Sequence, residues 1–280
     1  MAPVDIVNIR RVLIGFAGSA PAADDAIAAA AELASALGAE LTGLFVEDEL
    51  LFEAASLPWL RMLDPGRLMW QALNETELAR SHALAARALE RLLLGRAAAL
   101  GVAAAFQVVR GDPAMAPARR AEPTDLLVIA EPADPIARAL HHSQVLSAFG
   151  QTSATVLYVP HGAHPRAGPV VTLARSASDP ALKIAAPVAR ALNERLIVVA
   201  METNAEQEIA VAARSSMAGE CIALRLDAGS AVDWLDAVSR TLSAYRERLI
   251  VVNRGTSAEA LPVYLRLASE RAVSLLLAPG

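Results

Sequence analysis

Four of the five histidines have positions in this chain from which they could bind a metal ion. His141 and His142 are adjacent, so in a helix their side chains diverge by about 100° and cannot both coordinate one ion. His161 and His164 follow in a segment rich in glycine and proline, and they could meet the first pair near one end of a sheet, where zinc would favour imidazole. A solvent-exposed loop is the simpler interpretation of that segment. We therefore predict no metal site.

Ser19 has the position of a candidate nucleophile, at a turn that follows the apolar segment 12–16. The pattern G-x-S-x-G does not surround it, and no histidine is clearly placed to activate its hydroxyl group. The residues therefore predict no catalytic group and a protein that is not an enzyme.

Three arginines flank one turn of the chain: Arg110, Arg119 and Arg120. The turn itself is Gly111–Pro113, and the three side chains could bind an anion beside it. Ion pairs with Glu122 or Asp125 are the simpler expectation, because most surface charges form contacts of this kind.

The segments that must position these residues alternate between short apolar runs and helix-length stretches. Strands are predicted at 12–16, 41–46, 103–109, 126–130 and 155–159. Helices are predicted at 22–37 and 75–100, each followed by a glycine. A strand, helix, strand order with short links implies parallel strands with right-handed crossovers. Ligands bind beyond the carboxyl ends of such strands, so we expect any site to involve the loop 131–135.

The pattern restarts after the segment 161–168, HGAHPRAG, which is typical of a linker. Strands are predicted at 170–174 and 196–200, with a helix at 179–192 between them. The sequence RERLIVVNRG at 246–255 parallels EPTDLLVIAEP, and the run 272–278 parallels 152–159. We predict two copies of one unit, a first domain at 1–160 and a shorter second domain at 169–280.

The segment 47–74 interrupts this pattern in the first copy and has no counterpart in the second. We expect it to form short helical pieces. Its large apolar side chains form the candidate contact surface: Phe52, Trp59, Met62, Met69 and Trp70. Packing over a sheet edge or a helix is the simplest role. The alternative is a surface for a protein partner, a second subunit or an apolar ligand, because Trp and Met are enriched at interface cores.

The composition is that of a globular protein and supports binding to neither nucleic acid nor a membrane. The net charge is −5 and the arginines form no basic block. Glu32 and Glu40 interrupt the most alanine-rich run, which falls short of the roughly 18 apolar residues of a membrane helix. The single cysteine, Cys221, allows no intramolecular disulfide and is expected to act as a small buried hydrophobe. The first residues show no signal-like segment, so we expect a cytoplasmic protein.

Four segments resemble the universal stress protein family in their order and spacing: VLIGFAGS at 12–19, GDP at 111–113, DLLVIAEP at 125–132 and HSQVLSAFGQTSATVLYV at 142–159. The resemblance covers nearly the whole chain, as a tandem arrangement with a divergent second copy. It implies an α/β fold of two Rossmann-like or flavodoxin-like (adenine nucleotide alpha hydrolase-like) units. Each unit would be a mostly parallel five-stranded sheet of order 3-2-1-4-5 with helices on both faces. It also implies an intrachain pseudo-dimer in which 154–159 faces 274–278 across a pseudo-twofold axis.

The resemblance also implies a nucleotide site, from whose pattern this chain departs. Members that bind ATP hold the adenine with an aspartate at the end of the first strand, where this chain has Ala17. Their phosphate loop is rich in glycine, which lets backbone N–H groups approach phosphate closely. Here Ala130, Ala133 and His142 stand at the glycine positions, and only the following serine remains. The vestigial site is made of Ala17, Gly18, Ser19, Val46, Gly111, Ala130 and Ser143.

In the second copy, residues 174–176 fill the first-strand positions and 253–261 is too short for the family's glycine spacing. We therefore expect no cofactor and a non-catalytic regulatory or binding protein of the stress response. Its partner would be an unknown protein or a second copy of the chain, as a homodimer. One alternative is an ATP- or AMP-binding stress protein with an altered loop and slow hydrolysis. The other is an unrelated small-molecule enzyme on a Rossmann-like fold.

Overall fold

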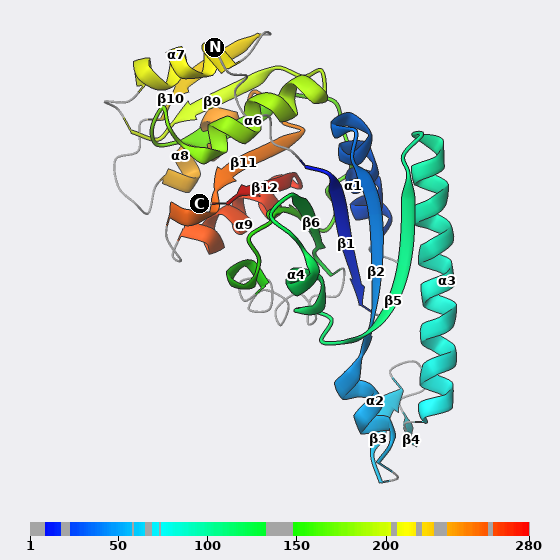
Figure 1. Ribbon diagram of the computed structural model, residues 1–280. Coiled ribbons are helices and arrows are strands. Elements are labelled where there is room, and N and C mark those ends of the chain that lie inside the picture. Colours follow the sequence, from blue (N-terminus) through cyan, green and yellow to red (C-terminus); the bar gives the residue numbers. More distant parts are fainter. Residues whose placement is uncertain are drawn as a thin grey trace.

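A computed structural model of the 280-residue chain describes residues 9–17, 23–57, 59–64, 69–72, 74–132, 148–202, 206–216, 220–226, 234–256 and 260–279. Its centre is one sheet of ten strands (Figure 1). The first half of the chain supplies β1 (Arg11–Ala17), β2 (Glu40–Asp48), β5 (Ala104–Gly111), β6 (Asp125–Ala130) and β7 (Thr155–Val159). The second half supplies β8 (Val170–Ala174), β9 (Leu196–Ala200), β10 (Cys221–Arg225), β11 (Leu249–Asn253) and β12 (Ser274–Ala278).

The strand order is β10-β9-β8-β11-β12-β7-β6-β1-β2-β5. Counted within each half, this is the predicted order 3-2-1-4-5, and all neighbours within a half are parallel. The two halves join where β12 and β7 pair antiparallel, with Leu276 opposite Leu157. The predicted meeting of the segments 154–159 and 274–278 is therefore confirmed.

Helices cover both faces of the sheet because the strands are apolar on both sides. One face is covered by α1 (Ala23–Leu37), α3 (Glu75–Ala99), α6 (Pro180–Ala191) and α7 (Glu206–Ser216). The other is covered by α4 (Ala116–Arg120), α8 (Trp234–Leu242) and α9 (Ala260–Arg271). Strands such as β7 and β9 are buried at every residue, which is the pattern of a strand enclosed by two helical layers. No helix in the described part of the chain is long and apolar enough to cross a membrane.

Several elements of the second half were not located from the sequence. These elements are α7, β10, α8 and α9. The strand β10 is only partly buried, and its sequence CIALR ends in the exposed Arg225. The predicted strands at 155–159, 170–174 and 196–200 match the observed bounds.

The segment 47–74 projects from the carboxyl ends of β2 and β5, beside the start of α3 (Figure 1). It contains α2 (Glu49–Ala55) and an antiparallel hairpin of β3 (Arg61–Asp64) and β4 (Met69–Ala72). The expectation of helical pieces throughout is therefore wrong for its second part. The Asp48 carboxylate starts α2 by accepting hydrogen bonds from the N–H groups of Leu50 and Leu51. Asn74 starts α3 in the same way.

Candidate functional site

The topological switch point of the first half lies between the adjacent parallel strands β1 and β6. The strand that follows β1 in the sheet, β2, lies on one side of this pair, and the strand that follows β6, β7, lies on the other. Ligands of open α/β sheets bind beyond the carboxyl ends of the strands at such a point. β1 ends there at Ala17 and β6 at Ala130, so two of the predicted vestigial residues lie at this edge. Val46 is paired with Ala17 in the neighbouring strand β2 and is buried. Gly111 ends β5 opposite Asp48, one strand further out.

The remaining predicted nucleotide residues, Gly18, Ser19 and Ser143, lie outside the described residues, as does the loop from Ala133 onward. The described part of that loop begins with Glu131, and its side chain is buried. Its backbone N–H donates to the carbonyl oxygen of Val159 at 2.8 Å, and its Oε2 accepts a hydrogen bond from the N–H of His161 at 2.8 Å. A buried carboxylate therefore follows the last residue of β6 directly.

The switch point of the second half lies between β8 and β11, and a second buried carboxylate lies beside it. Asp179 accepts a hydrogen bond from the N–H of Arg175 at 3.0 Å and another from the N–H of Ala181 at 2.9 Å. It thereby caps α6, whose first residue is Pro180. The backbone donors that face a ligand in anion-binding loops are here bonded to the protein's own carboxylate.

Arg254 follows β11 at this end of the sheet and reaches across to the first half, where its Nη1 donates to the carbonyl oxygen of Ala154 at 3.3 Å. Burial lowers the pKa of its guanidinium group from the usual value of an arginine. The side chain therefore bridges the two halves.

A cluster of aromatic and charged side chains holds α2 against the body of the protein at the carboxyl ends of β2 and β5. The guanidinium carbon of Arg110 lies 4.1 Å from the centre of the Phe52 ring, and its Nη2 lies 3.3 Å from Oε2 of Glu47. His82 of α3 contacts the edges of both Phe52 and Phe45, at 5.4 and 5.7 Å between ring centres. His82 is buried, and within the described residues its Nδ1 has no hydrogen-bond partner. The sequence interpretation did not single out His82. Its position seven residues before Leu89 places it on the same face of α3 and would have predicted its burial.

The predicted contact surface divides into a buried and an exposed part. Phe52 is buried beneath α2, so it belongs to the packing of the segment and not to its surface. Trp59, Met69 and Trp70 are 72%, 63% and 65% exposed. The side chain of Met62 lies outside the described part of the structure.

The predicted partners of the three arginines near Gly111 are wrong. Asp125 instead binds Arg11 of β1, whose Nε lies 3.1 Å from Oδ1 and whose Nη2 lies 2.5 Å from Oδ2. Arg120 contributes only its carbonyl oxygen, at 3.5 Å from Nη2 of Arg11. The reason is register: Arg11 and Asp125 are directly opposite in adjacent strands, whereas α4 ends beside them.

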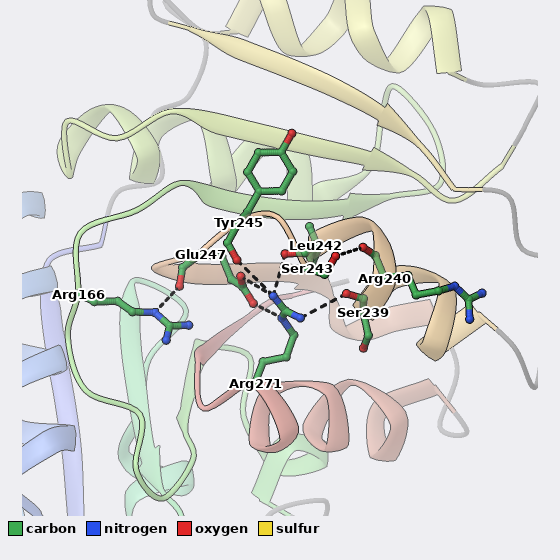
Figure 2. Close-up of polar contacts among 8 residues, drawn as sticks. All are labelled: Arg166, Ser239, Arg240, Leu242, Ser243, Tyr245, Glu247 and Arg271. Atoms are coloured by element: carbon green, nitrogen blue, oxygen red, sulfur yellow. Dashed lines mark hydrogen bonds and ion pairs between the residues drawn. The ribbon is translucent and has the colours of Figure 1, made fainter.

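A buried polar cluster of the second half joins Glu247 and Arg271 (Figure 2). Glu247 is wholly buried, and both its carboxylate oxygens accept hydrogen bonds from Arg271, the Oε2 contact at 2.9 Å. The same guanidinium group donates to the carbonyl oxygens of Ser239, Leu242 and Tyr245 at and beyond the end of α8. Arg166 donates to the carbonyl oxygen of Glu247 at 2.7 Å. The hydrogen bond to Glu247 raises the pKa of Arg271. This cluster joins structural elements and faces neither switch point.

The histidines considered as metal ligands are not gathered into a site within the described residues. His161 is engaged through its backbone, and the Nδ1 of His164 lies 2.7 Å from Oδ1 of Asp25 in α1. His141 and His142 lie outside the described residues. No group of three or more His, Cys, Asp or Glu side chains in the described ranges could hold a metal ion.

Comparison with known proteins identifies the fold. No family model matches the sequence, and no curated protein matches it. The structure is similar to that of a universal stress protein from Archaeoglobus fulgidus DSM 4304, with a TM-score of 0.64 and 12% identity over 97% of each chain.

Two structures from Pseudomonas aeruginosa are also similar. A protein of strain UCBPP-PA14, provisionally assigned as a universal stress protein, has a TM-score of 0.57 and 15% identity over 98% of this chain and 94% of its own. A protein of unknown function from strain PAO1 has a TM-score of 0.55 and 14% identity over 97% and 93%. The chain therefore has the fold of universal stress proteins over nearly its whole length.

Proposed function

We propose that this chain is a tandem universal stress protein that acts by binding another molecule without catalysis, and that neither half binds ATP. The fold shared with such proteins supports the stress-protein role. The single cysteine, which allows no intramolecular disulfide, supports action in the cytoplasm.

The observation that carries the proposal is the buried carboxylate of Glu131 directly after β6. A triphosphate at the switch point would bring several negative charges close to it. A carboxylate side chain at this position favours a triphosphate less than the glycine N–H donors of a phosphate loop do. The carboxylate accepts the N–H of His161 and so is held in place by the segment that links the two halves.

The second half supports the same proposal through Asp179. A phosphate group binds at a helix start through free backbone N–H groups. At α6 the N–H of Ala181 is taken by Asp179, and Pro180 has no N–H. Binding of a phosphate there would require the buried carboxylate to move away.

Titration calorimetry with ATP and AMP, in the presence of magnesium, tests the proposal. We expect no binding at nucleotide concentrations up to about 1 mM, which corresponds to less than about 4 kcal/mol of binding free energy. Thermal unfolding provides a second readout, because a ligand that binds the native state raises the midpoint. Micromolar binding of either nucleotide, with a matching rise of the midpoint, would instead support the ATP- or AMP-binding alternative.

A further inference from the structure

The outer side of α3 carries a line of exposed arginine and leucine side chains. The opposite side of the helix is buried, with Leu89 and Leu93 in the core. Leu84 lies nine positions before Leu93, which is about half a turn round the helix axis, so it points away from the core. The residues in line with it are all exposed, and we call them the α3 stripe: Arg80, Leu84, Arg87, Arg91, Leu94 and Ala98.

The spacing of the α3 stripe is that of a surface on which a second helix packs. Its members follow one another in steps of four, three, four, three and four residues. Such steps keep side chains in one line along a helix, and a partner helix can follow that line. From Arg80 to Ala98 the line is about 27 Å long, which corresponds to about 18 residues of a second helix. Because every member is exposed, no helix in the described part of the chain covers it.

The α3 stripe is basic, although the chain as a whole has a net charge of −5. Within the described residues none of its three arginines forms an ion pair, and the Nε of Arg91 donates to the carbonyl oxygen of Arg87. Glu75 and Glu77 lie in the first turn of the helix, before the stripe begins. Glu90 points about 100° to the side of Arg91. The guanidinium groups of the stripe therefore have no acidic partner in this part of the structure.

We propose that the α3 stripe binds an amphipathic helix of another protein, whose contacting side carries acidic and apolar residues at the same spacing. Its carboxylates would pair with the three arginines, and its apolar side chains would contact Leu84 and Leu94. A second copy of α3 is a poor occupant, because its arginines would face those of the stripe. Such a helix would be the molecule that the chain binds without catalysis, so the proposal rests on the proposed function.

The projecting segment lies beside the start of α3 and adds apolar surface there (Figure 1). Its exposed large side chains are Trp59, Met69 and Trp70, and tryptophan is enriched among the residues that dominate binding energy. A partner helix that continues past Arg80 toward the start of α3 would reach them. The stripe alone offers about 270 Å², well below the roughly 800 Å² that each partner of a stable complex buries. We therefore expect a transient complex, with a dissociation constant of about 10 μM.

Fluorescence anisotropy of a labelled peptide with the full chain tests the proposal. The probe is a helical peptide of about 20 residues, with glutamate and leucine on one side at the spacing of the stripe and alanine and glutamine elsewhere. We expect binding that weakens with added salt, because the paired charges are exposed. Arg87→Glu should raise the dissociation constant about tenfold, and Leu84→Ala about fivefold.

Two controls separate the stripe from charge in general. Arg214→Glu on α7 makes the same charge change on an exposed residue at the other end of the sheet, and it should leave the affinity unchanged. A peptide of the same composition with its glutamates and leucines in shuffled order should bind about tenfold more weakly, because it presents no continuous acidic and apolar side. All substituted residues are exposed, so circular dichroism should show the wild-type fold for each variant.

Three results would overturn the proposal. The first is no binding of the probe at about 100 μM protein, or binding that Arg87→Glu does not weaken. The second is equal affinity for the shuffled peptide, which would exclude recognition of a helix. The third is tighter binding of a single-stranded oligonucleotide or of anionic lipid vesicles through the same arginines. The peptide assay contains no nucleotide, so its failure is distinguishable from the binding of ATP or AMP that would contradict the proposed function.

Discussion

Each half of the sheet has a buried carboxylate at the start of its fourth strand, Asp125 as the first residue of β6 and Glu247 two residues before β11, and different groups neutralise the two. In the first half Asp125 binds Arg11 from the neighbouring strand and also accepts the N–H of Glu122 at 2.7 Å. In the second half Glu247 is bound by Arg271 from the end of α9. Both carboxylates form an ion pair with an arginine, but Arg11 comes from a strand and Arg271 from a helix.

The difference follows from register. Arg248 occupies the strand position of Asp125, and Pro169 occupies that of Arg11. Arg248 turns outward, to 2.7 Å from Glu32 of α1 and 3.3 Å from Glu194. The second half therefore uses this position to bind the first half, and its own carboxylate moves one residue earlier. The two halves therefore both pair a buried carboxylate with an arginine at the start of the same strand, but the arginine comes from a different element in each half.

The largest expected effect is on the Glu247 cluster. Arg271→Leu leaves a wholly buried carboxylate without its cation and removes the donor to three carbonyl groups at α8. We expect the free energy of unfolding to fall by about 4 kcal/mol. Urea unfolding followed by circular dichroism measures it. Arg266→Leu on the same helix is the control and should change nothing measurable, because its pair with Glu270 is exposed. Equal effects of the two variants would contradict the role of burial.

A smaller effect is expected for the corresponding pair of the first half. Arg11→Leu leaves Asp125 with the backbone N–H of Glu122, and the arginine it removes is about one-third exposed to water. We expect a loss of about 2 kcal/mol in the same urea measurement. A loss of unfolding free energy as large as that of Arg271→Leu would show that the N–H of Glu122 does not compensate for the missing guanidinium group. The two halves would then not differ in how strongly they depend on the arginine.

The smallest expected effect concerns Cys221, which has Ala104 at the corresponding strand position of the first half. Burial raises the pKa of the Cys221 thiol, so the folded state holds this proton more tightly than the unfolded state does. Its contribution to stability is therefore fully present below a pH of about 8.5 and is lost as the pH rises above it.

Cys221→Ala should remove a small decline in the free energy of unfolding between about pH 8 and pH 10. Urea unfolding of both proteins across this range measures the decline. Identical pH profiles would show that the thiol environment does not distinguish the folded from the unfolded state.

Much of the fold could be predicted because local patterns carry it. Apolar runs such as 155–159 and 170–174 are buried on both faces, and a strand of that kind is recognisable without any knowledge of its neighbours. The strand β10 was missed because its apolar run of four residues is too short to distinguish a strand from part of a helix. The hairpin of β3 and β4 was missed because the prolines and aromatic residues of its segment were taken to indicate short helices. Such residues do not determine which strands pair.

The candidate site divides in the same way. The lack of an acidic residue at Ala17 and of a glycine at Ala130 is visible in the sequence, because it concerns the type of residue at a strand end. The buried state of Glu131 and the capture of backbone donors by Asp179 are not visible, because they depend on hydrogen bonds formed only in the fold.

The sequence by itself determined the inner strands of both halves and the residue types at their ends, since these depend on residue type and local periodicity. Only the tertiary structure decided which charges meet and which apolar side chains stay exposed. Arg11 and Asp125 lie 114 residues apart, and Arg248 and Glu32 lie 216 apart. Such pairs depend on strand register and on the contact between the halves, which no local pattern encodes. The same holds for α3, whose outward face became recognisable only when its buried face was known.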